Sequence, residues 1–156
     1  KLLNKYFKSM IDVVFKFNGT LDKIVGDELM VLYGVPLKSE DDTENAVKTA
    51  VQMFKSLDKF NERIIKDGFK PFKIGIGINK GKAVSGNIGS NQQMNYTVIG
   101  DTINLGARLC SHAKSGQILI SNSVKDVIGD NYDFKKIPTI EVKGKSKPIE
   151  VWSYMH

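Results

Sequence analysis

The chain has 156 residues, of which 41% are hydrophobic, and its formal net charge is +6. This length suffices for one domain with a real hydrophobic core. Lysines supply nearly all of the positive charge and are spread along the chain. That pattern indicates a solvated surface or the steering of phosphate groups, and it argues against a nucleic-acid partner.

The single cysteine, Cys110, excludes an intrachain disulfide framework and fits a reducing compartment. No apolar run approaches the roughly 20 residues of a membrane span, and no signal peptide is visible. We therefore expect a cytoplasmic domain, while a membrane anchor outside this chain stays open. Cys110 is expected to pack as a small residue rather than to act as a nucleophile.

Hydrophobic spacing predicts the secondary structure in chain order. Apolar residues from Leu2 to Phe15 recur at helical spacing and predict an amphipathic opening helix. Two strands follow at residues 20–25 and 29–33, joined at Gly26-Asp27. The other expected elements are a long helix from Asp41-Asp42 to about residue 65, strands at 72–79, 83–88 and 96–99, a helix with Asn104 and Arg108, a strand at 118–121, a short helix at 124–128, and a hairpin of residues 134–142 and 149–154.

The order of these elements indicates the fold class. We expect the strands at 72–79 and 83–88 to pair around a turn at Lys80-Gly81. The long helix is expected to turn one apolar face inward. That face comprises Ala46, Ala50, Met53, Phe54 and Leu57. Helices interleaved with antiparallel hairpins predict a single α+β sandwich.

The most informative segment is residues 96–108. A β-branched strand runs into a turn at Gly100-Asp101, which opens a helix carrying Asn104 and Arg108 one turn apart. This spacing places the amide and the guanidinium on one helical face near the helix N-terminus. An amide suits sugar hydroxyls, a guanidinium fork suits phosphate oxygens, and a positive helix end favours the same anion. The segment therefore predicts a nucleotide site.

Together with four other segments, it resembles the class III nucleotidyl cyclases, the adenylyl and guanylyl cyclase family. The matching segments stand in the family's order along the whole chain, at residues 21–34, 75–81, 86–89, 96–108 and 142–145. The resemblance implies one class III cyclase homology domain over residues 1–156, with the family's ferredoxin-like palm, a βαββαβ-type sandwich. The family's first strand is missing, and the chain starts without a methionine inside a helical pattern. We therefore expect an N-terminally incomplete domain.

Asp27 is the candidate metal ligand. A carboxylate beside glycine at the tip of a hairpin can approach phosphates bound to Mg²⁺ or Mn²⁺, although an isolated Gly-Asp is usually an ordinary turn. The resemblance implies that Asp27 binds one or both of two divalent cations. Relatives pair this aspartate with another on the preceding strand, and Asp12 in the opening helix is no substitute. Either the chain begins late, as the absent methionine favours, or the protein is a degenerate cyclase.

Lys23 and Thr97 are the candidate residues for base choice. Adenine offers an acceptor at N1 and donors at its exocyclic amine, which a lysine donor and a threonine acceptor match. Taken singly, each is an ordinary strand residue. In the family, guanine-selective members typically carry an acidic residue and a cysteine at these places. The resemblance therefore implies ATP as the substrate, and threonine resembles a subgroup common in bacteria and in bicarbonate-responsive soluble enzymes.

The resemblance also implies the roles of the remaining site residues. Asn104 would orient the ribose, and Arg108 would stabilise charge on the phosphates during attack. Either Lys143 or Lys145 would contact the terminal phosphates, and the sequence does not choose between them. The neutral pair Gln92-Gln93 departs from the basic residues that many relatives carry there, which puts one phosphate contact in doubt.

The implied function is that of an adenylate cyclase. Two divalent ions would activate the 3′-hydroxyl of ATP for attack on the α-phosphate, giving 3′,5′-cyclic AMP and pyrophosphate at the interface of a head-to-tail homodimer with composite sites. Regulatory domains outside this chain are compatible with this picture. The alternatives are a catalytically degenerate module for nucleotide binding or dimerisation and, behind it, a guanylate cyclase. Residues 25–29 also resemble part of the diguanylate cyclase signature, which leaves the Asn104 and Arg108 helix unexplained.

Overall fold

The computed structural model describes residues 1–88, 95–141, 144 and 147–156, with the backbone alone described over 85–88 and 95–99. Its helices are α1 (Leu2–Lys16), α2 (Asp42–Lys66), α3 (Asp101–His112) and α4 (Asn122–Ile128). Its strands are β1 (Thr20–Val25), β2 (Glu28–Leu32), β3 (Ile76–Ile78), β4 (Val84–Ile88), β5 (Asn95–Ile99), β6 (Gln117–Ser121), β7 (Lys135–Ile140) and β8 (Ile149–Met155). The expected α+β class is confirmed. Within the described ranges, none of the helices has both the length and the apolar content that crossing a bilayer requires.

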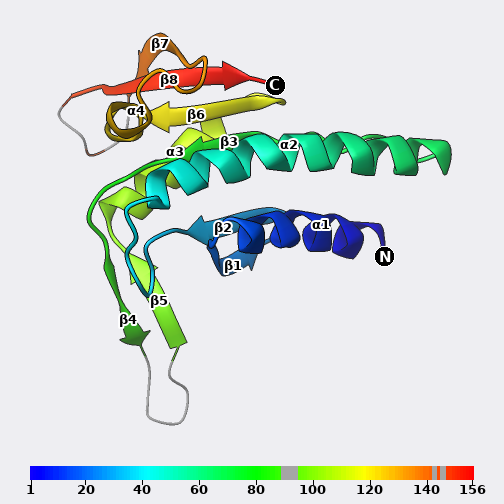
Figure 1. Ribbon diagram of the computed structural model, residues 1–156, viewed down its shortest axis with the longest axis horizontal. Coiled ribbons are helices and arrows are strands. Elements are labelled where there is room, and N and C mark those ends of the chain that lie inside the picture. Colours follow the sequence, from blue (N-terminus) through cyan, green and yellow to red (C-terminus); the bar gives the residue numbers. More distant parts are fainter. Residues whose placement is uncertain (89–94, 142–143, 145–146) are drawn as a thin grey trace.

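The strands form three sheets. Four of them make a sheet in the order β3-β6-β8-β7, in which β3 and β6 are parallel and the other neighbours antiparallel. The β1–β2 hairpin and the β4–β5 ribbon are separate antiparallel pairs. Figure 1 shows α2 between the four-stranded sheet and the layer of α1 with the β1–β2 hairpin, while the ribbon projects away from both layers.

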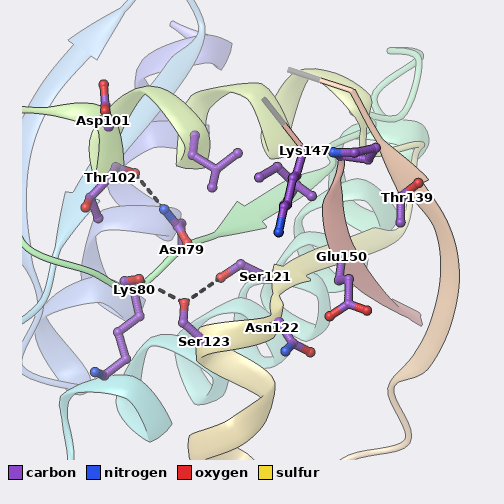
Figure 2. Close-up of a pocket in the computed structure, with 13 residues that line it drawn as sticks. Asn79, Lys80, Asp101, Thr102, Ser121, Asn122, Ser123, Thr139, Lys147 and Glu150 are labelled. Carbon is purple, nitrogen blue, oxygen red and sulfur yellow. Dashed lines mark hydrogen bonds between the residues drawn. The ribbon is translucent and has the colours of Figure 1, made fainter. Parts of the chain in front are cut away.

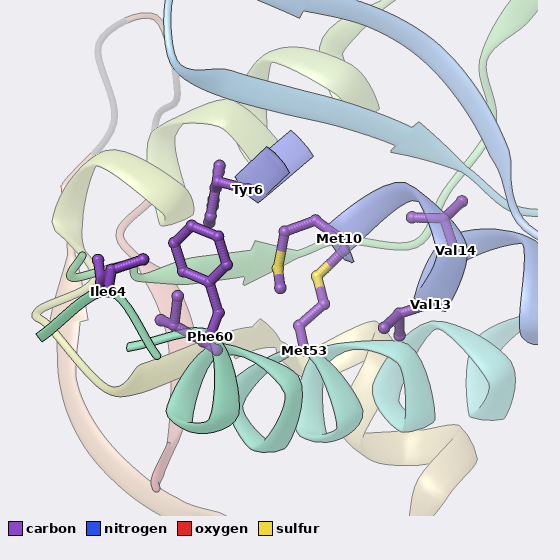
Figure 3. Packing of buried hydrophobic residues seen from close by; sticks show 8 residues of the cluster. Tyr6, Met10, Val13, Val14, Met53, Phe60 and Ile64 are labelled. Carbon is purple, nitrogen blue, oxygen red and sulfur yellow. The ribbon is translucent and has the colours of Figure 1, made fainter. Parts of the chain in front are cut away.

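The long helix α2 is buried on two faces, which joins these layers. Its first face packs with α1, and Figure 3 shows Met53 and Phe60 meeting Tyr6 and Met10 there. Its second face packs against β6 and α4 through Val47, Ala50 and Phe54. The predicted inward residues Ala50, Met53, Phe54 and Leu57 are buried, as expected, and Ala46 is partly buried.

Two expectations about the strand at 72–79 were wrong. The strand is short because Phe72 lies outside the sheet, where its backbone N–H and C=O bond the side chain of Asn61 on α2 at 2.8 and 2.9 Å. The Lys80-Gly81 turn does not close a hairpin either. Instead β3 pairs in parallel with β6, and β4 pairs with β5.

Glycine at position 77 lets α3 rest directly on β3. A Cβ at Gly77 would lie 2.3 Å from the backbone nitrogen of Cys110 and 2.7 Å from the carbonyl carbon of Leu109. These are backbone atoms of α3, so no side-chain rotation relieves the contact. The thiol of Cys110 also donates to the carbonyl of Gly75 at 3.7 Å. The absence of a side chain at Gly77 therefore sets the position of α3.

We predict that Gly77→Ala destabilises the fold by about 1–3 kcal/mol, because α3 must move off β3. Gly106→Ala is the matched control: Gly106 lies within α3, and the nearest atom to its added Cβ is the Cβ of Asn79 at 3.8 Å. That change should stabilise the helix by about 1 kcal/mol or less. Thermal unfolding of the two variants measures both effects. Equal stabilities would show that α3 shifts without cost.

Candidate active site

The β1–β2 turn presents Asp27 to solvent. Val25 pairs with Glu28, so that Gly26 and Asp27 form a two-residue loop, and Gly26 has the positive φ (62°) that its first position favours. Asp27 is exposed, and its carboxylate makes no hydrogen bond or ion pair with any side chain that the structure describes. Burial, and next the charge of Asp27, raise the pKa of Tyr6 on α1 to about 12. The turn therefore brings the negative charge of Asp27 close to α1.

The residues available for a divalent cation fit in part. Asp27 offers a hard carboxylate oxygen, and Mg²⁺ commonly uses one or two carboxylates together with substrate phosphates and water. Among the described residues, no group of three or more histidine, cysteine or acidic side chains is arranged to hold a metal. Asp27 would thus be one ligand of a cation that the nucleotide helps to bind.

Lys23 lies on the same hairpin, opposite Met30 on β2. Its side chain is half exposed, and its ammonium lies 3.8 Å from a carboxylate oxygen of Asp22. Sequence reasoning missed Asp22, because an acidic neighbour of an exposed lysine is an unremarkable pattern. Burial alone distinguishes this carboxylate, which is 6% exposed.

Asn104 and Arg108 lie on the exposed side of α3, one turn apart. Neither side chain has a hydrogen-bond or ion-pair partner among the residues the structure describes. The backbone nitrogens of Ile103 and Asn104 donate to the carbonyl of Gly100, which closes the first turn at 3.1 and 3.2 Å. The helix backbone that carries the amide and the guanidinium is thus fixed, and no described side chain occupies either group.

Two side chains that sequence reasoning did not single out fix the start of α3. Asn79, which follows β3, donates its amide to the carbonyl of Thr102 at 3.0 Å, as Figure 2 shows. Thr102 donates its hydroxyl to the carbonyl of Lys82. The signal for Asn79 was its place in the glycine-rich segment 75–81, which points to close packing but not to a partner.

The predicted site residues whose side chains the structure describes form two groups. Lys23 and Asp27 lie on the β1–β2 hairpin, and Asn104 and Arg108 lie on α3. No hydrogen bond or ion pair between described residues joins the two groups. Thr97 lies on β5, where its backbone pairs with Gly86, and the structure describes only the backbone of this residue. The predictions for Lys143, Lys145 and Gln92-Gln93 also fall outside the described residues. The structure therefore gives the positions of two of the predicted groups, and the roles predicted for all of these residues stay predictions.

A pocket of about 700 Å³ lies beside the start of α3 (Figure 2). It is lined by Thr102 and Leu105 of α3, by the start of α4, and by Lys147 ahead of β8. Of the described site residues that the sequence analysis nominated, namely Lys23, Asp27, Asn104 and Arg108, none lines this pocket. It borders the helix of the candidate site without containing Asn104 or Arg108.

The amino-acid sequence matches a known family. Residues 1–155 match the family model described as the adenylate and guanylate cyclase catalytic domain. Adenylate cyclase 1 of Rhizobium meliloti is 28% identical over 97% of this chain, and the adenylate cyclase of Anabaena cylindrica is 32% identical over 97%. The chain spans 23% and 31% of the lengths of these two relatives.

Solved structures agree with this match. The guanylyl cyclase Cya2 superposes with a TM-score of 0.93 at 38% identity, covering 98% of this chain and 78% of that one. The adenylyl cyclase CyaB from P. aeruginosa gives a TM-score of 0.88 at 32% identity, covering 97% and 79%. The motifs, the fold and the three comparisons lead to one conclusion: the chain belongs to the adenylate and guanylate cyclase catalytic domain family.

Proposed function

We propose that this domain is an adenylate cyclase that converts ATP to 3′,5′-cyclic AMP and pyrophosphate. The observation that carries the proposal is the pair Asn104 and Arg108, exposed on a fixed helix with no partner among the described side chains. An arginine without a counter-ion beside an amide is suited to phosphate and ribose. Family membership makes cyclisation the reaction that such a pair serves.

The reaction forms one bond and breaks one bond. The ribose 3′-oxygen attacks the α-phosphorus and its proton passes to solvent water, while the bond from that phosphorus to the β-phosphate oxygen breaks and pyrophosphate leaves. Arg108 would offset the negative charge that develops on the phosphates, and Asn104 would hold the ribose in line for attack. Asp27 would hold divalent cations, Mg²⁺ or Mn²⁺, which when bound make the 3′-hydroxyl more acidic and neutralise phosphate charge. Lys143 or Lys145 would contact the terminal phosphates.

Base choice depends on individual residues rather than on overall similarity. The relatives above include both a guanylyl cyclase at 38% identity and adenylyl cyclases at 28–32%. Lys23 is exposed on the hairpin, where its donors are available to the N1 acceptor of adenine. Thr97 would accept from the exocyclic amine. This pair supports ATP over GTP.

We also infer a head-to-tail homodimer with composite active sites. The hairpin group and the α3 group share no described contact, which is the arrangement expected if each group completes a site with the other group of a second copy. The hairpin also exposes apolar side chains beside Lys23, namely Ile24 and Val25, of which Val25 is 61% exposed. Exposed apolar neighbours at a polar site support an interface there.

The first prediction concerns the product. The protein that carries this chain should form cyclic AMP from ATP with Mn²⁺, and Arg108→Ala should lower kcat on the order of 100-fold or more because transition-state charge is left uncompensated. Arg63→Ala, at the exposed end of α2, is the matched control and should leave the rate unchanged. Chromatography of the nucleotide products measures both. Cyclic GMP from GTP in place of cyclic AMP would overturn the base assignment.

The second prediction concerns shared sites. Asp27→Ala and Arg108→Ala subunits, each inactive alone, should recover activity when mixed, because a mixed dimer holds one intact composite site. With random exchange, half of the dimers are mixed, so recovery should approach about a quarter of the wild-type rate. Subunit exchange is verified separately by differently tagged copies. Exchange without recovery would contradict composite sites.

A regulatory module without catalysis is the second candidate. It is favoured by the absence, among the described residues, of any group of three or more histidine, cysteine or acidic side chains that could hold a metal, and by the neutral pair Gln92-Gln93 in the sequence. A folded, dimeric sample that binds ATP and forms no cyclic product would support the regulatory module over the cyclase.

A further inference from the structure

Asp22 carries a buried carboxylate oxygen that accepts no hydrogen bond from the part of the chain that the structure describes. Its side chain is 6% exposed, and its Oδ2 atom has no hydrogen-bond partner among the residues described. An ionised carboxylate accepts hydrogen bonds only, and leaving it buried and unsatisfied is costly. Such a group in a folded protein calls for an explanation beyond packing.

A β-bulge explains how the side chains of the neighbouring residues Asp22 and Lys23 approach each other. Leu21 pairs with Val31 and Lys23 pairs with Met30, so Asp22 is an extra residue with no partner on β2. Adjacent side chains on a regular strand point to opposite faces, whereas a bulge re-aims them. Here the Nζ atom of Lys23 lies 3.8 Å from Oδ2 of Asp22.

The pair is buried at one end and open at the other. Oδ2 of Asp22 is closed to solvent, so it cannot contact a nucleotide itself. The Lys23 side chain is 47% exposed. The 3.8 Å separation exceeds a hydrogen bond, so the ammonium keeps its three donors for a ligand while the buried charge attracts it. The described contact through which Asp22 can act on a ligand in solvent is its ion pair with Lys23.

We propose that Asp22 is a positioning residue that holds the Lys23 ammonium for recognition of the nucleobase and so strengthens the preference for ATP over GTP. The inference rests on the proposed function, because it assigns a supporting residue to the same site. A lysine side chain loses considerable rotamer freedom when it is fixed on a ligand. A fixed neighbouring charge that restricts the ammonium beforehand reduces that loss on binding.

The test is a double-mutant cycle with steady-state kinetics on ATP and on GTP. Asp22→Asn keeps the shape and removes the charge, and it should raise KM for ATP about tenfold, the effect of losing one charged interaction of about 1.4 kcal/mol. It should lower the ratio of kcat/KM for ATP to that for GTP. In a Lys23→Met background the same change should have little further effect, because its route of action is gone.

A purely structural role gives a different result. If Asp22 only supports the hairpin, Asp22→Asn lowers turnover of both nucleotides alike and does so equally with Lys23 or Met at position 23. That outcome overturns the inference. Asp12→Asn is the matched control, because Asp12 forms an exposed ion pair with Lys8 at 3.0 Å on α1, and it should leave KM and the ratio unchanged.

Two further measurements keep the inference testable. Should Asp22→Asn fail to fold, Asp22→Glu keeps the charge and displaces it by one methylene, and an unchanged ratio of ATP to GTP in that variant overturns the proposal. Should the wild-type protein form no cyclic product, adenylate cyclase function fails while base recognition does not. Calorimetric affinities for ATP and GTP then replace kinetics in the same cycle, and equal affinities overturn the role of Asp22.

Discussion

The candidate site depends on the close approach of α3 to β3 at Gly77. Because the helix backbone meets the strand directly, the position of α3 is set by main-chain contact at Cys110 and Leu109. Asn79 then fixes the start of the helix. None of these contacts uses Asn104 or Arg108. The scaffold therefore fixes the backbone that carries the two polar side chains and uses neither side chain in the contacts that the structure describes.

The hairpin with Lys23 and Asp27 belongs to a different packing unit. Leu29 and Val31 of β2 pack against the cluster between α1 and α2, whereas Leu109 of α3 packs with Leu119 and Val151 of the four-stranded sheet. Because α2 contributes to the α1 cluster on one face and to the sheet on the other, it connects the two units. Each polar group thus has its own apolar support, which suits a site assembled from two copies of the chain.

Local patterns predicted the helices, the Gly26-Asp27 turn and the four-residue spacing of Asn104 and Arg108, because each depends on neighbours in sequence. The pairing of β3 could not be read in the same way. Its partner β6 lies about 40 residues further on, and the Lys80-Gly81 turn resembles a hairpin turn when read alone. Asp22 escaped notice because its burial depends on the register between β1 and β2. The roles of all the nominated site residues stay predictions: Lys23, Asp27, Thr97, Asn104, Arg108, Lys143 and Lys145.

The packing of Cys110 against β3 affects the reactivity of its thiol. Burial is the main cause that raises the pKa of this thiol, and the negative charge of Glu28 adds to it. A raised pKa leaves less thiolate at neutral pH, and the thiolate is the form that alkylating reagents attack. Because Cys110 is the chain's single cysteine, a second cysteine placed on an open surface would react first. The chain's own thiol should therefore react more slowly with maleimide dyes than a cysteine introduced on the surface, which favours site-directed fluorescence on the native background.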